Sequence, residues 1–190
     1  MPSNQLKSGT VRKSGPPRKL TPQELFDYAV RYLAGRAASS AELAAKLRAK
    51  AVNPHDADAT VIRLREIGYL NDERFAESFA NWRVENQGFG KTRVLNDLRA
   101  RRVPQNLAEQ AVEHALEGRN ESEMADAYIL RRMPALATAG KIEDQRKLAA
   151  AWRRLRRAGF SSGAAMSALK RLAARPEELE EPAEDEEEEQ

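Results

Sequence analysis

The sequence predicts an all-α fold, an elongated tandem array of three three-helix repeats flanked by a disordered basic N-terminal tail and a disordered acidic C-terminal tail. Composition supports helices, because 41% of the 190 residues are hydrophobic, 32% are charged and only 10 are Gly. A segment of the form Leu-Arg-x-x-x-apolar also occurs three times, and each copy is followed nine positions later by another apolar residue. The resulting pairs are Val52 and Val61, Val103 and Val112, and Phe160 and Leu169.

Charge separates the tails from the repeats. Residues 1–20 carry five basic and no acidic side chains, whereas residues 177–189 carry ten carboxylates and no base. Neither segment has the apolar residues to build a core, so both are expected to be disordered. The predicted organisation is a basic tail at 1–20, repeats at 21–70, 71–118 and 119–175, and an acidic tail at 176–190.

Capping residues define the helices of the first repeat. Thr21 and Glu24 flank a Pro at the first helical position, which predicts a helix to about Arg36. Ser39 and Glu42 form a second capping box, and Asn53 followed by a Pro begins a third helix that ends at Gly68. One repeat is therefore expected to contain three short helices.

The later repeats follow the same plan. In the second repeat, helices are expected from Asp72 to about Glu85, from Lys91 to Arg101 and from Pro104 to Leu116; in the third, near 121–137, 143–158 and 162–173. An aromatic stripe of Phe75, Phe79 and Trp82 lies on the first of these helices at spacings of four and three residues. Such a stripe favours a buried core over a platform for stacking bases.

The sequence contains no catalytic constellation, so the chain is not expected to be an enzyme or to need a cofactor. Gly90-Lys91-Thr92 resembles the end of a P-loop, but Glu85 stands where the leading Gly is required. His55 and His114 lack a second His or a Cys at metal-ligand spacing, and the chain has no Cys, so no metal site is expected. Paired acids such as Glu143 and Asp144 lie in first helical turns, where they complement the helix dipole.

Basic charge accumulates in the third repeat. Residues 21–140 hold 17 basic and 17 acidic side chains, whereas residues 141–175 hold ten basic and two acidic ones. If Leu148, Trp152 and Leu155 are buried, the helical turn places cations on the opposite face and one flank. We predict a surface that binds nucleic-acid phosphates or an acidic protein groove, in preference to a solvated face. Its residues are Arg146, Lys147, Arg153, Arg154 and Arg157, with Lys170, Arg171 and Arg175 as an extension.

The junction of the first two repeats carries a specific motif. It reads Gly68-Tyr69-Leu70-Asn71-Asp72-Glu73-Arg74-Phe75-Ala76 and resembles the signature of the RecX regulatory proteins. The resemblance covers about residues 22–172. Its motif is interpreted as structural: Gly68 ends a helix, Tyr69 and Leu70 pack at the junction, Asn71 caps the next helix ahead of Asp72, and Phe75 enters the core.

This resemblance implies a modulator of the RecA recombinase, and the absence of a long apolar segment leads us to expect a cytoplasmic protein. It would lie in the groove of the RecA filament and restrain filament growth, strand exchange and co-protease activity, without a catalytic role. The expected partners are RecA and single-stranded, and also double-stranded, DNA. We expect a monomer, and no segment has the length of apolar sequence that a membrane span requires.

Two alternatives remain open. One three-helix repeat could act as a helix-turn-helix transcription regulator, although the last helix begins Ser161-Ser162-Gly163-Ala164-Ala165, which is poor in base-reading side chains. The acidic tail could compete with phosphate for the basic face, or it could serve only to solubilise the chain.

Overall fold

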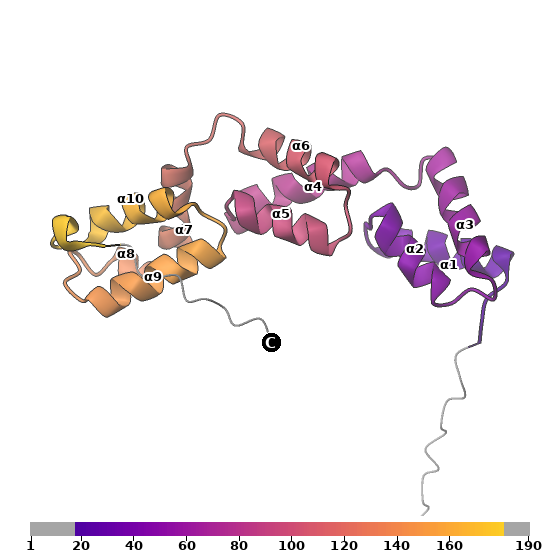
Figure 1. Cartoon of the computed structure of the whole chain (residues 1–190), viewed down its shortest axis with the longest axis horizontal. Coiled ribbons are helices and arrows are strands. Elements are labelled where there is room, and N and C mark those ends of the chain that lie inside the picture. Colours follow the sequence, from indigo (N-terminus) through magenta and orange to yellow (C-terminus); the bar gives the residue numbers. More distant parts are fainter. Residues whose placement is uncertain (1–17, 181–190) are drawn as a thin grey trace, which may run out of the picture. The chain divides into compact units, whose positions relative to one another are not determined.

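The computed structural model describes residues 18–180, and its regular structure is helical throughout this range (Figure 1). No β-strand is formed in the described part of the chain, and the all-α prediction is confirmed. The tail predictions for residues 1–17 and 181–190 lie outside the described residues. The helices are α1 (Pro22–Gly35), α2 (Ser40–Arg48), α3 (Pro54–Glu66), α4 (Asp72–Trp82), a π-helix (Arg83–Gln87), α5 (Lys91–Ala100), α6 (Gln105–Leu116), α7 (Glu121–Arg132), α8 (Pro134–Ala137), α9 (Gln145–Arg157), α10 (Ser162–Leu172) and a 3-10 turn (Pro176–Glu178).

The chain divides into two compact units. The first comprises residues up to 36 together with 43–69, and the second comprises residues 37–42 together with the chain from Leu70 onward. The three repeat boundaries stay a prediction, because these units group the chain differently. The second unit contains the regions predicted as the second and third repeats.

In the first unit, α1 packs against α3 around small and branched apolar side chains. Leu25, Leu43 and Leu64 are fully buried. Thr21 begins α1 as expected, since both its amide and its hydroxyl donate to the Glu24 carboxylate, at 2.9 and 3.0 Å. The Asn53 side chain accepts the amide of His55 at 3.0 Å and so caps α3.

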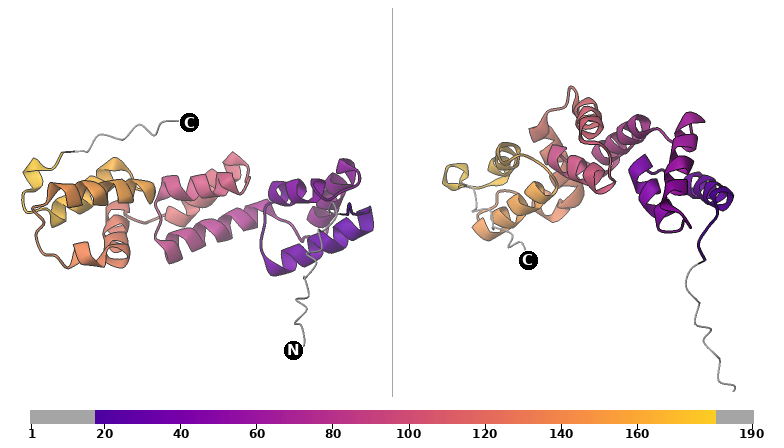
Figure 2. Two further views of the ribbon diagram at one scale, coloured as in Figure 1. Left: turned by 90° about the horizontal axis from the view of Figure 1, so that it is seen from below. Right: turned by 45° about the vertical axis from the view of Figure 1, so that its right-hand side comes forward.

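In the second unit, two apolar clusters share partners. One gathers side chains of α4, α5 and α6, and the other gathers side chains of α7, α9 and α10. Phe89 and Met124 pack against both clusters, which makes the two cores continuous. Figures 1 and 2 show α9 and α10 lying side by side in this unit.

A direct backbone contact joins the second and third predicted repeats. The amide of Gly90 donates to the carbonyl of Ala158 at 2.9 Å, and the amide of Thr92 donates to that of Gly159 at 3.2 Å. A Cβ added at Gly90 would lie 2.4 Å from the Gly159 oxygen. This approach therefore requires Gly at position 90, and the φ of +92° at Gly159 favours Gly there as well.

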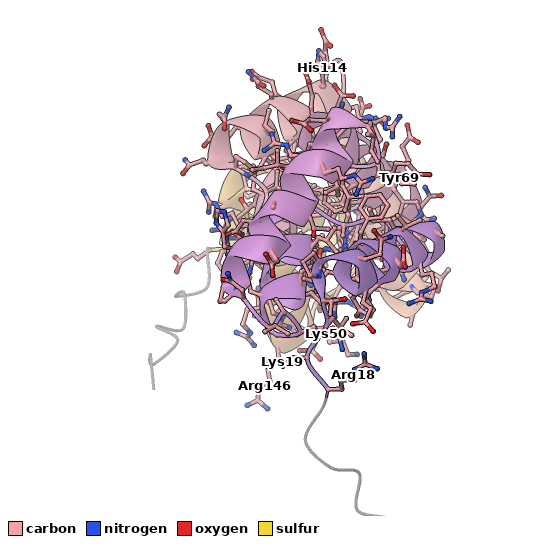
Figure 3. All side chains as sticks on the ribbon, turned by 90° about the vertical axis from the view of Figure 1, so that its right-hand side faces the viewer. Arg18, Lys19, Lys50, Tyr69, His114 and Arg146 are labelled. Atoms are coloured by element: carbon pink, nitrogen blue, oxygen red, sulfur yellow. The ribbon has the colours of Figure 1, made fainter. Side chains whose placement is uncertain are left out.

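Three apolar or aromatic positions that the sequence patterns singled out are exposed. Val52 is 66% exposed, because the first repeated segment closes one residue earlier, with the Ala51 amide bonded to the Leu47 carbonyl. Tyr69 is 54% exposed; its amide closes α3 by donating to Leu64, while its ring lies at the surface (Figure 3). Trp82 is 48% exposed at the end of α4, so only the earlier part of the aromatic stripe fills the core.

Two helix predictions need correction. The helix expected over residues 121–137 is broken between α7 and α8, because Pro134 has no amide to donate and its ring clashes with a preceding helical carbonyl. The helix expected to reach Glu85 keeps an α conformation only to Trp82 and then widens into the π-helix, which ends at Gly88 with φ of +71°.

Candidate nucleic-acid interface

Helix α9 supplies the scaffold of the predicted basic surface. Asp144 caps it, since the carboxylate accepts the amides of Arg146 and Lys147 at 3.0 and 3.3 Å. Its inner face buries Leu148, Trp152 and Leu155, with 0–2% of each side chain exposed. Because these apolar residues fix the rotation of the helix, the positions of the basic side chains follow from them.

The cations of α9 form two adjacent rows on its outer side. Arg146, Arg153 and Arg157 make one row and Lys147 and Arg154 the other, as a helical turn of 100° requires. Arg153 is half-buried and the other four are exposed. Figure 3 shows Arg146 extending away from the ribbon. Long charged side chains over small neighbours leave their head groups accessible to a partner.

The second row borders a groove of about 810 Å³ between α9 and the segment that contains α8. Four cations line this groove: Arg132, Lys141, Lys147 and Arg154. Met133 and Ile142 are buried apolar residues of its wall, and Glu143 and Asp144 lie at one end. Lys147 pairs with Asp144 at 3.7 Å, but both side chains are well exposed, so the pair contributes little.

The other predicted cations have different roles. Arg171 is held by Asp126, with an Nη2–Oδ2 distance of 2.6 Å, and it also donates to the Ser122 carbonyl. Arg175 pairs with Glu178 at 3.1 Å. Lys170 is exposed on α10. The predicted extension through Arg171 is therefore weakened, because Asp126 of α7 neutralises a charge that seemed unopposed in the sequence.

Arg156 is a structural residue within the same helix. Its Nη1 donates to the Phe160 carbonyl at 2.8 Å, and its guanidinium lies 5.8 Å from the centroid of the Trp152 ring. It therefore helps to close the end of α9 rather than joining the outer rows.

The residues of the Gly68 to Phe75 motif organise the chain locally. Gly68 has φ of +79°, and the Asn71 side chain caps α4 by accepting the amide of Arg74 at 2.8 Å. Leu70 and Phe75 are buried. Asp72 accepts the amide of Ser40 at 2.7 Å, which fixes the first turn of α2 within the second unit.

The P-loop-like segment has its backbone groups engaged. A P-loop offers free amides to phosphate, but those of Gly90 and Thr92 are bonded to the last carbonyls at the end of α9. Lys91 lies instead along a groove of about 860 Å³ lined by Glu73, Glu77 and His114. Within residues 18–180, no group of three or more His, Asp or Glu side chains is arranged to hold a metal ion.

The start of α10 is not free to read bases. Ser161 caps the helix by accepting the amide of Ala164, and its own amide and hydroxyl donate to the Glu121 carboxylate at 2.8 and 2.6 Å. A recognition helix needs its first turn open to the major groove. This geometry disfavours the transcription-regulator alternative. Among the described helices, none is long and apolar enough to cross a membrane.

Comparisons with known proteins identify the family. Residues 26–64 match the first three-helix domain of RecX, and residues 71–112 match the second. The regulatory protein RecX of Deinococcus radiodurans is 33% identical over 153 residues, covering 80% of this chain and 69% of that protein. The chain belongs to the RecX family. A regulatory protein RecX of Thermus thermophilus is also 33% identical, over 145 residues that cover 76% of this chain and 89% of the relative.

Solved RecX structures share the fold. The crystal structure of RecX from Lactobacillus salivarius matches with a TM-score of 0.64 at 16% identity, over 80% of this chain and 96% of that one. A second crystal structure of regulatory protein RecX matches with a TM-score of 0.59 over 75% of this chain. The helical repeat architecture is thus the RecX architecture, and the basic face of α9 lies in the region beyond the two matched domains.

Proposed function

We propose that this RecX protein modulates the RecA recombinase, in the inhibitory direction, by binding in the groove of the RecA–DNA filament. Occupying the groove would limit filament extension, strand exchange and co-protease activity, which places the protein in DNA repair, recombination and the SOS response. It would act as a cytoplasmic monomer and carry out no catalytic step itself. Family membership and the basic face of α9 support this proposal.

The cations on the outer side of α9 are the observation that supports binding to a polyanion. Five basic side chains lie on the outer side of one helix, and the only carboxylate paired with any of them is Asp144, within the described chain. A surface helix that only needs solubility mixes both signs of charge. The unopposed rows therefore favour a partner that supplies negative charge, such as the phosphate backbone or an acidic strip of the filament.

Contacts with DNA phosphates would give binding a measurable dependence on salt. If five phosphates of a single strand are neutralised, the logarithm of the binding constant should fall against the logarithm of salt with a slope of roughly −3 to −4. A flat salt response would remove phosphate contacts from the proposal. Binding to RecA protein alone would then be the remaining route.

DNA-dependent ATP hydrolysis by the cognate RecA, with and without this chain, tests the proposal directly. Wild-type protein is expected to lower the steady-state rate. Replacing Arg153, Arg154 and Arg157 by Gln should raise the concentration needed for half-inhibition at least about tenfold, given charge-assisted contacts of this kind. A matched control removes three exposed arginines elsewhere: Arg65, Arg74 and Arg99.

Four outcomes decide between explanations. Loss of inhibition in the α9 variant but not in the control supports the proposed surface. Equal loss in both would indicate that net charge alone matters. An unchanged ATPase rate with the wild-type chain would overturn modulation of RecA, and measurable nucleotide hydrolysis by the chain without RecA would contradict the absence of a catalytic step.

A further inference from the structure

The first unit carries a cluster of tyrosines and cations that does not involve α9. Tyr28 and Tyr32 lie one turn apart on α1, with ring centroids 6.3 Å apart and planes inclined by 21°. The Lys50 ammonium lies 5.0 Å from the Tyr28 centroid, and that of Lys46 lies 5.2 Å from the Tyr32 centroid. Two lysines thus rest on two partly exposed rings, which we call the Tyr28–Lys50 surface.

Two carboxylates of this unit form ion pairs with arginines. The Glu24 carboxylate accepts a hydrogen bond from the Thr21 amide and pairs with Arg18 at 2.8 Å. The Asp58 carboxylate pairs with Arg48 at 2.6 Å. Within residues 18–180, no carboxylate forms an ion pair with Lys46 or Lys50. Neither lysine is therefore neutralised by an ion pair within the described residues.

Neighbouring cations extend the positive charge. Lys19 lies against the same end of the unit, since its Nζ donates to the Ala49 carbonyl at 3.0 Å and the Lys50 carbonyl accepts the amide of Leu20. Figure 3 shows Lys19 and Lys50 together at this end. Arg31 is exposed on α1, three residues after Tyr28. Three cations, Lys46, Lys50 and Arg36, thus lie over the two rings, and Lys19 and Arg31 add positive charge to the same unit.

We infer that the Tyr28–Lys50 surface is a second binding site, specific for single-stranded nucleic acid. A cation resting on an exposed ring is held weakly, whereas an ammonium on a phosphate makes a charge-assisted hydrogen bond. A phosphate can therefore draw Lys50 from Tyr28 and uncover the ring face. An unpaired base can then stack on that face, as on other single-strand binding surfaces.

The aromatic rings select this ligand over two others. A duplex keeps its base faces stacked inside the helix, so it can use the lysines but not the ring of Tyr28. An acidic protein surface likewise offers carboxylates without a planar base.

Binding of a labelled oligothymidine to the full chain, without RecA, tests this site. The background variant lacks the α9 arginines 153, 154 and 157, so that the remaining affinity reports the first unit. In that background, Tyr28→Leu should weaken binding by roughly 5- to 150-fold, the range for one stacked base, and leave the salt slope unchanged. Replacing Lys46 and Lys50 by Gln should reduce the salt slope by about 1.4, for two phosphates on a single strand.

Arg63→Gln is the matched control in the same unit. Arg63 lies 4.2 Å from the centroid of Phe26, so this variant also removes one cation resting on a ring. It should lower oligothymidine affinity less than twofold. Equal losses for Arg63→Gln and the lysine variant would overturn the inference, as would wild-type affinity of Tyr28→Leu in protein whose helical circular dichroism is unchanged.

A duplex of the same length separates the site from general attraction to DNA. Tyr28→Leu should leave duplex affinity unchanged while it weakens single-strand affinity, and an equal loss on both ligands would overturn the stacking role. The assay contains no RecA, so its failure leaves the proposed filament function standing. Conversely, loss of RecA modulation with intact Tyr28-dependent binding would remove only the proposed function.

Discussion

Replacing Gly90 by Ala should break the contact between the second and third predicted repeats. Gly90 has φ of −79° and ψ of 172°, which Ala adopts without strain, so any destabilisation must come from the contact itself. The new Cβ would lie 2.4 Å from the Gly159 oxygen and 2.7 Å from the Phe160 amide nitrogen. Both neighbours are backbone atoms, which cannot swing aside as a side chain would.

The expected loss follows from the bonds at this site. Moving the backbone apart sacrifices the two hydrogen bonds donated by Gly90 and Thr92, worth about 1 kcal/mol each, and adds overpacking of about 1–3 kcal/mol. The total is about 3–5 kcal/mol. For a chain of this size it corresponds to a fall in melting temperature of roughly 6–20 °C.

Thermal unfolding followed by helical circular dichroism measures this loss, and Gly118→Ala is its control. Gly118 has a positive φ of +70° but open space around it, so that variant introduces only backbone strain, about 1–2 kcal/mol. Gly90→Ala should melt clearly below Gly118→Ala. A Gly90→Ala protein that melts within about 2 °C of wild type would refute the role assigned to this contact.

Two further predictions concern the two ends of the sequence. The amide of Thr21, and then its hydroxyl, hold the pKa of Glu24 below its ordinary value of 4.5, helped by Arg18 and opposed by burial. The stability that this capping box contributes should be fully present above about pH 4.5 and should be lost as the pH falls through the lowered pKa of Glu24 in the folded protein. An NMR titration that finds the pKa of Glu24 at 4.5 or higher would contradict this prediction. Deleting residues 181–190, which carry seven carboxylates, should tighten DNA binding at low salt if the tail competes for the basic face; unchanged affinity would leave solubilisation as its role.

Local signals predicted the helices well. Ser39 accepts the amide of Glu42 at 3.0 Å, as their spacing indicated, and Asn120 likewise accepts the amide of Glu123, three residues later, at 3.3 Å. These interactions span three residues, so they are visible in sequence. Interactions with a distant part of the chain are not: Glu42 also pairs with Arg101 at 2.8 Å, a contact that no local spacing indicates.

Burial was harder to predict than helicity. Periodicity identifies which residues share a face, but the exposure of Trp82 and Val52 depends on where neighbouring segments end. The packing of the chain also determines which charges are neutralised. Asp126, for example, neutralises Arg171, which lies 45 residues away in the sequence.

Charge counting likewise concealed the Tyr28–Lys50 surface. The count over residues 21–140 sets these lysines against carboxylates such as Asp58, which pairs with Arg48 instead. A local signal did exist, because Tyr28 and Tyr32, and separately Lys46 and Lys50, are four residues apart. Only the packing of α1 against α2 and the residues that follow it shows that the two pairs meet.

The backbone pairing of Leu20 occupies a carbonyl whose counterparts join segments of the second unit. In the second unit, the Ala158 carbonyl accepts the amide of Gly90, and the Arg101 carbonyl accepts the hydroxyl of Ser39. At the corresponding place in the first unit, Lys50, that carbonyl is already taken by Leu20 from the same unit. Because this carbonyl is occupied, we expect head-to-tail addition of another copy of the protein to be disfavoured at this end of the first unit.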